Sequence, residues 1–217
     1  MNQNNLIQQL IKKVQEKLEA YKLSLAAVSV EKEYTKIENT WNSIAKTTSH
    51  PVKYLIIGEA TVSYKNYFYN SSSKQTPFLT PKHFNCKRKV ELINLFQKEG
   101  VLIFDLYPLP LPTFIYDNVS FDCMDDEYVG LLNEYYQEKL EGLIDKNTTV
   151  VLRYIKLEDR SECDIFKKFL IEYGITVHEV SEKLKSGEII TRALNISGST
   201  YANPSKIKSV FSSVKEG

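Results

Sequence analysis

A short apolar run constrains the fold of this chain more than any other feature. Residues 53–57 read KYLII and lie between Pro51 and Gly58, which predicts a buried β-strand. Glu59 and Ala60 follow the glycine directly. In open α/β sheets ligands bind at the carboxyl ends of the strands, and a glycine there lets the backbone approach a ligand closely. The run therefore predicts a buried strand that ends either at a binding site or simply at an exposed acid.

Predicted strands and helices alternate along the chain. Apolar residues at helical spacing predict helices at residues 2–22, 30–45, 89–97, 127–144 and 161–173, with a last one from Asn203-Pro204. Short apolar runs predict further strands at residues 101–104, 149–154 and 175–180. In the helix at 89–97 we expect Val90, Leu92, Ile93 and Phe96 to face inward.

This alternation predicts a three-layer α/β/α sandwich with a mainly parallel central sheet of about four strands. The length of the chain suits a single domain over residues 1–217. In this domain residues 1–48 would form an N-terminal helical extension packed on the rest. The sequence contains no run of about 20 apolar residues, and its first residues lack the apolar core of a signal peptide. We therefore expect a cytoplasmic protein without a membrane partner.

Charge and cysteine content limit the possible ligands. The formal net charge is +1, so affinity for a nucleic acid has to come from a local basic patch. Cys86, Cys123 and Cys163 lie far apart and form no CxxC pair, which argues against a structural zinc or an iron–sulfur cluster. We expect no metal and no other cofactor, and isolated thiols fit a reducing compartment.

A second segment places an acid at the end of another predicted strand. Asp105 follows the apolar run 101–104 directly, so it would lie near Gly58 and Glu59 if the two strands are neighbours. A carboxylate at this position is either a fixed acceptor facing a pocket or a side chain that only hydrogen-bonds the following turn. Both interpretations stay open.

A third segment combines small hydroxyl residues with lysines. The residues of a predicted loop before the last helix are Ser197, Gly198, Ser199 and Thr200. Hydroxyls and backbone N–H groups suit a phosphate contact, and Lys206 and Lys208 follow in the helix. The segment is either a DNA-phosphate contact or an ordinary surface loop in which Asn203 caps the helix.

The order of these motifs resembles that of the uracil-DNA glycosylase superfamily. Its members share a strand followed by a loop such as G-E-A-P-G, then a Pro-Phe pair, a strand ending in a base-reading Asn, and an H-P-S or N-P-S loop before a last helix. Here Gly58-Glu59-Ala60 matches the first loop, and Pro77-Phe78 matches the pair. Asp105 stands at the Asn position, and Asn195 stands where a histidine is expected. The resemblance covers residues 53–211 and leaves the N-terminal helices unexplained.

The resemblance implies a DNA glycosylase, which flips a base out of DNA and hydrolyses its N-glycosidic bond. It implies that Glu59 positions the water and that Asn195 donates a hydrogen bond to the leaving base. Phe78 would stack on the flipped base, and Gly58, Ala60 and Asp105 would complete its binding site. DNA, single-stranded or duplex, is then the partner, and no obligate protein partner is indicated.

Asp105 bears on which base such an enzyme would release. An Asn amide offers a donor and an acceptor, which suits uracil, whereas an ionised Asp only accepts. It would accept from the exocyclic amine of a cytosine and would face the O4 of uracil unfavourably. We therefore expect a modified cytosine rather than uracil, and a modified base of phage DNA would make the protein a defence factor.

Departures from the family pattern keep other functions open. Thr61 and Val62 replace the Pro-Gly of the first loop, and the branches with G-E-A usually bind an iron–sulfur cluster, for which this chain lacks the cysteines. Ala60, Val62 and Asn195 would also suit a non-catalytic, nucleic-acid-binding relative of the same fold. The third interpretation is an unrelated α/β enzyme that acts on a nucleotide or a phosphoester.

Overall fold

A parallel sheet forms the centre of the molecule. The computed structural model describes residues 3–23, 26–73, 80–112, 115, 125–152, 161–172, 174–175, 179–183, 189–193, 197–198 and 201–202. Its sheet has the order β2–β1–β3, with β1 at Tyr54–Ala60, β2 at Val101–Tyr107 and β3 at Thr149–Leu152. Both pairings of β1 are parallel, and Ile56 lies beside Ile103 on one side and Val151 on the other.

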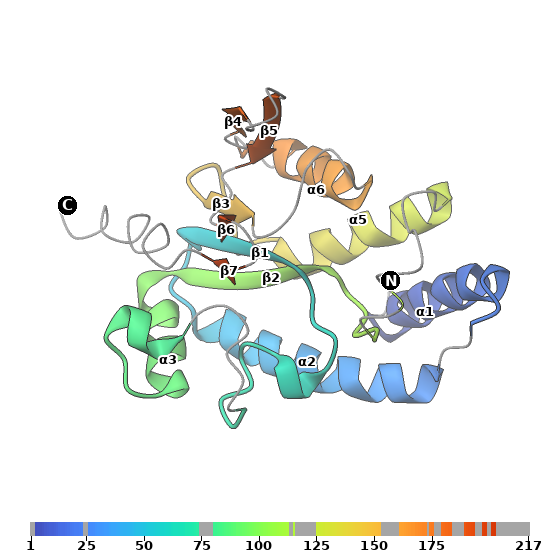
Figure 1. Ribbon diagram of the computed structural model, residues 1–217, viewed down its shortest axis with the longest axis horizontal. Helices are drawn as coiled ribbons and strands as arrows, with labels where there is room; N and C mark the ends of the chain where they lie inside the picture. The colour runs from blue at the N-terminus through green and yellow to red at the C-terminus, as the bar shows by residue number, and fades with distance from the viewer. Residues whose placement is uncertain are drawn as a thin grey trace.

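Helices cover the sheet on both faces. The helices are α1 at Gln3–Ala20, α2 at Ala27–Thr47, α3 at Lys89–Glu99, α5 at Asp126–Leu140 and α6 at Ser161–Glu172, with short 3-10 turns η1 at Tyr64–Asn66 and η2 at Pro81–Phe84. Figure 1 shows α2 and α3 on one side of the sheet and α5 and α6 on the other. The predicted α/β class with a parallel sheet between helices is therefore confirmed.

The N-terminal helices share the core of the sheet. The buried apolar residues of α1 belong to the same hydrophobic cluster as the strands; they are Leu6, Ile7, Leu10, Ile11, Val14 and Leu18. Lys13 fixes α1 to the start of α5, because its Nζ lies 2.9 Å from an Asp125 oxygen and 2.5 Å from a Glu127 oxygen. Asp125 also caps α5, as its carboxylate accepts from the Tyr128 N–H.

Side chains cover the outer edge of β2. Trp41 of α2 donates its Nε1–H to the carbonyl of Ile103 at 2.9 Å, and the Ile103 N–H donates to the Tyr69 hydroxyl at 2.7 Å. These bonds satisfy backbone groups that an edge strand would otherwise leave unpaired. The bond from Trp41 also fixes α2 against the strand that carries Asp105.

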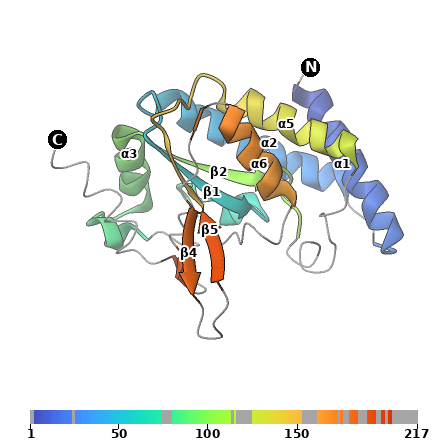
Figure 2. The same ribbon diagram turned by 90° about the horizontal axis from the view of Figure 1, so that it is seen from above.

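Five sequence predictions need correction. Strand β1 continues to Ala60 and β2 to Tyr107 because their parallel pairing continues, with Gly58 beside Asp105 and Ala60 beside Tyr107. The predicted strand 175–180 does not join the sheet through its described residues, since β4 at Glu179–Lys183 pairs antiparallel with β5 at Ile189–Ala193. Figure 2 shows this hairpin extending away from the sheet.

The other two corrections concern smaller features. Ser197 and Gly198, predicted in a loop, form the two-residue strand β6, which pairs antiparallel with β7 at Tyr201–Ala202. Val90 is 37% exposed, whereas Leu92, Ile93 and Phe96 are buried as predicted.

None of the described helices is long and apolar enough to cross a membrane.

Candidate functional site

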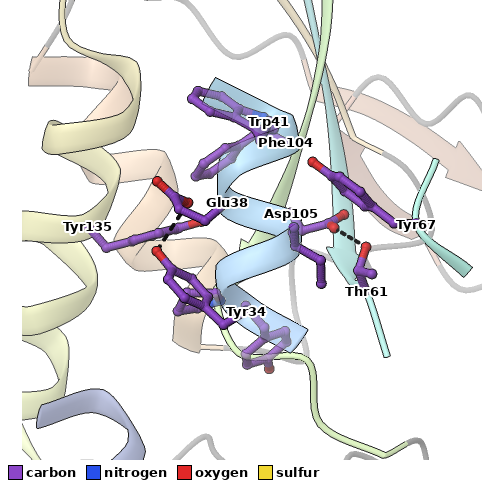
Figure 3. Close-up of a pocket in the computed structure, with 11 residues that line it drawn as sticks. Tyr34, Glu38, Trp41, Thr61, Tyr67, Phe104, Asp105 and Tyr135 are labelled. Atoms are coloured by element: carbon purple, nitrogen blue, oxygen red, sulfur yellow. Dashed lines mark hydrogen bonds between the residues drawn. The ribbon is translucent and has the colours of Figure 1, made fainter. Parts of the chain in front are cut away.

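A small pocket lies at the carboxyl ends of β1 and β2. Its walls come from α2, from the two strands and the segments that follow them, and from α5 (Figure 3). The described lining residues are Tyr34, Ile37, Glu38, Trp41, Thr61, Tyr67, Phe104, Asp105, Tyr107, Pro108 and Tyr135. Its volume is about 20 Å³, which is room for about one water molecule. The pocket thus combines two carboxylates, Glu38 and Asp105, with walls that are mostly aromatic.

Asp105 reaches this pocket by lying across Gly58. The two residues are partners in the parallel pairing of β1 and β2, and a Cβ on Gly58 would come within 2.2 Å of Asp105 Oδ1. Only glycine therefore leaves room for the carboxylate in this position. The Thr61 hydroxyl donates to Asp105 Oδ2 at 2.5 Å, and the Asp105 side chain is half-buried. The acid is thus a positioned acceptor at the pocket wall.

Glu38 belongs to a buried polar network on the opposite wall. Its carboxylate pairs with the ammonium of Lys139, which is only 4% exposed, and it accepts from the Asn42 amide at 2.8 Å and the Tyr34 hydroxyl at 3.1 Å. Lys139 Nζ also donates to Asn42 Oδ1 at 2.8 Å and lies 4.2 Å from the ring centroid of Trp41. Glu38 is therefore neutralised by a cation, whereas the Asp105 hydrogen bond described above comes from a hydroxyl.

Three phenols of the pocket, those of Tyr34, Tyr67 and Tyr135, stay protonated at neutral pH. Burial, with a contribution from Asp105, holds the pKa of Tyr67 well above its usual range. Burial likewise raises the pKa of Tyr135, and both Glu38 and Asp105 add to that shift. The pKa of Tyr34 is raised by burial and by its contact with Glu38. Each of these hydroxyls therefore keeps its proton and remains able to donate a hydrogen bond.

Burial acts in the opposite direction on Lys139. It lowers the pKa of the ammonium, and the neighbouring carboxylate of Glu38 opposes that shift. The charged form of Lys139 therefore depends on Glu38. The two residues act as one unit in the wall of the pocket.

The structure brings part of the predicted site together. Gly58, Ala60 and Asp105 lie on paired strands, and Asp105 lines the pocket. Glu59 lies between them in β1, but its side chain is outside the described part of the structure. The other predicted site residues outside it are Phe78, Asn195, Ser199, Thr200, Lys206 and Lys208. Among the described residues, no group of three or more His, Cys, Asp or Glu side chains could hold a metal ion.

Sequence reasoning missed the wall that α2 contributes. Tyr34, Ile37, Glu38 and Trp41 follow the spacing i, i+3, i+4 and i+7, which places them on one face of a helix. A glutamate inside such an apolar face was the available signal, because a buried carboxylate requires a partner. Its partner, Lys139, lies 101 residues further along the chain, and no local pattern connects the two.

Gly58→Ala tests whether the position of the Asp105 carboxylate depends on the absence of a side chain at residue 58. We expect the new methyl group to push the Asp105 carboxylate away from Thr61 and to lower the free energy of unfolding by about 1–3 kcal/mol, the usual cost of overpacking. Urea unfolding of the variant measures this change.

Gly130→Ala is the matched control for that substitution. Gly130 lies inside α5, and a Cβ there would meet nothing within 4 Å. We expect this variant to be more stable than the parent by about 0.4–1 kcal/mol. Equal and small effects of the two substitutions would show that Asp105 is not held against Gly58.

No family model, curated protein or solved structure matches the chain.

Proposed function

We propose that the protein is a DNA glycosylase that binds a flipped base and hydrolyses its N-glycosidic bond, with a modified cytosine rather than uracil as its base. The observation that carries this proposal is the Asp105 carboxylate, which lies across Gly58 at the carboxyl ends of two paired parallel strands. This is the edge of an α/β sheet at which ligands bind. DNA is then the partner and the cytoplasm the expected location.

The hydrogen bonding of Asp105 supports the choice of base. Oδ2 accepts from Thr61, and an ionised carboxylate has only acceptors to offer. A base with an exocyclic amine can donate to it, as cytosine does through N4, whereas the O4 of uracil would face it with lone pairs. The pocket therefore favours a 4-amino base over a 4-keto base.

The size of the pocket bears on how a base would bind. A volume of about 20 Å³ holds about one water-sized group and cannot enclose a pyrimidine ring. The half-buried Asp105 and Thr61 therefore meet the amino edge of the base at the mouth of the pocket. Aromatic stacking on a flipped base contributes about 1–3 kcal/mol, and Phe78 stays the proposed stacking residue, with Glu59 and Asn195 as the catalytic pair.

The experiment is base release from oligonucleotides. Single-stranded and duplex DNA with one uracil, cytosine or 5-modified cytosine is incubated with the protein, and alkali then cleaves any abasic site. We expect abasic sites at a 5-modified cytosine and few at uracil. Preferential release of uracil would refute the argument from Asp105.

The small pocket also favours a second candidate function. A cavity that holds only one water-sized group suits a relative that binds nucleic acid without removing a base. This function predicts binding to the same oligonucleotides, with no abasic site formed at any base. Measuring binding and base release on one set of oligonucleotides separates the two functions.

A further inference from the structure

A second concavity is larger than the pocket. It has a volume of about 630 Å³, and its described lining consists of Ser71, Ser72, Ser73, Pro81, Arg88, Lys89 and Val90. We call it the basic groove. Its described lining contains two cationic side chains, three hydroxyls and no carboxylate. The groove therefore offers positive charge and hydrogen-bond donors to an anion.

A hydrogen bond links the basic groove to the pocket. Lys89 Nζ donates to the Tyr67 carbonyl at 3.2 Å, while the side chain of Tyr67 lines the pocket with Asp105. A ligand that extends from the pocket past Tyr67 would therefore approach Lys89 of the groove.

Lys89 is buried in the floor of the groove. It is 7% exposed, and its Nζ lies 5.7 Å from the ring centroid of Phe68. Burial lowers the pKa of its ammonium to about 8, since a low-dielectric site disfavours the charged form. A phosphate in the groove would favour the charged form again, as an opposite charge within a few ångströms does.

The N-terminal end of α3 is occupied by a carboxylate of its own helix. Glu91 already occupies that end, because its carboxylate accepts from the Lys87 N–H at 2.8 Å and from the Arg88 N–H at 3.4 Å. The donors that remain relevant are the side chains. Arg88 is 74% exposed and pairs with Glu91 through Nε, and a guanidinium carries further N–H donors that can reach a phosphate.

We propose that the basic groove binds the sugar–phosphate backbone of a single DNA strand next to the nucleotide whose base is held at the mouth of the pocket. This inference builds on the proposed function, because it names where the strand lies. It also supplies the local basic patch that a chain with a net charge of +1 needs to bind DNA. The hydroxyls of Ser71–Ser73 would contact the same phosphates.

The test is a salt titration of DNA binding with groove variants. The probe is a fluorescent single-stranded oligonucleotide with unmodified bases, and the variants are Arg88→Ala and Lys89→Met. We expect each variant to bind about tenfold more weakly, because a charge-assisted hydrogen bond is lost. The slope of log K against log salt should fall by about 0.7 for each lost phosphate contact.

Lys12→Ala provides the matched control, since Lys12 is a lysine on α1 whose side chain is 75% exposed. It should leave both affinity and slope unchanged. Arg88→Ala is decisive if Lys89→Met unfolds, because Arg88 is exposed and its replacement keeps the fold. Lost affinity with an unchanged slope would mean a structural role and would overturn the proposal, as would unchanged binding by Arg88→Ala or equal competition by polyglutamate.

Base release on matched oligonucleotides separates this inference from the proposed function. Binding through the groove without release of any base would refute the proposed glycosylase activity but not the proposed binding site. Base release with unchanged binding by the groove variants would refute the proposed binding site but not the glycosylase activity. An absence of DNA binding by the parent protein would overturn both.

Discussion

Asp105→Asn is expected to reverse the base preference of the pocket. The amide oxygen can take the place of Oδ2 and keep the hydrogen bond from Thr61, while the new NH₂ group takes the place of Oδ1 above Gly58. The fixed charge is lost and a donor appears. A base with a 4-amino group should then bind less well and a 4-keto base better. Each good or bad bidentate pairing is worth about 1–3 kcal/mol, or roughly 5- to 150-fold in rate.

The measurement is the ratio of single-turnover rates for a 5-modified cytosine and uracil in the same oligonucleotide. Thr61→Val is the control, because it removes the hydroxyl that orients Asp105 and leaves the charge in place. We expect this control to slow release of both bases and to change their ratio much less than Asp105→Asn does. An unchanged ratio in Asp105→Asn would mean that Asp105 does not read the base.

Much of the fold follows from local patterns in the sequence. The apolar runs at 53–57 and 101–104 predict the central strands, because strands buried on both faces consist of consecutive apolar residues. The apolar pattern places the ends of these strands too early, because Gly58 and Asp105 interrupt it while the backbone pairing continues past them. Pairing depends on the neighbouring strand, so the apolar pattern of one strand alone cannot locate its end.

The sequence predicts only the part of the site that strand pairing brings together, which is Asp105 beside Gly58. The rule that ligands bind at the carboxyl ends of strands places Asp105 near Gly58, and the structure pairs these residues. Glu38 and Lys139 meet through packing between α2 and α5, far apart in sequence. The apolar side chain of Val90 predicts a position in the core, yet Val90 lines the basic groove. Such tertiary contacts leave no local pattern in the chain.

Loss of either partner of the Glu38–Lys139 pair is expected to cause the largest change in stability. Glu38→Leu would leave an ammonium that is 4% exposed without its carboxylate, and Lys139→Met would leave that carboxylate buried without its cation. Removing one partner of a buried ion pair typically costs about 3–5 kcal/mol. Urea unfolding of each single variant measures the loss.

The double variant Glu38→Leu/Lys139→Met separates the cost of an unpaired charge from the value of the pair. With both charges absent, no buried ion remains, and replacement of a buried pair by apolar residues is often neutral. We therefore expect the double variant to be more stable than either single one, with a remaining loss because Tyr34 and Asn42 no longer have their acceptor.

The exposed pair of Lys12 and Glu16, 3.7 Å apart, is the control, and its disruption should leave the unfolding midpoint unchanged. Additive losses in the double variant would mean that Glu38 and Lys139 stabilise the fold independently and not as a pair.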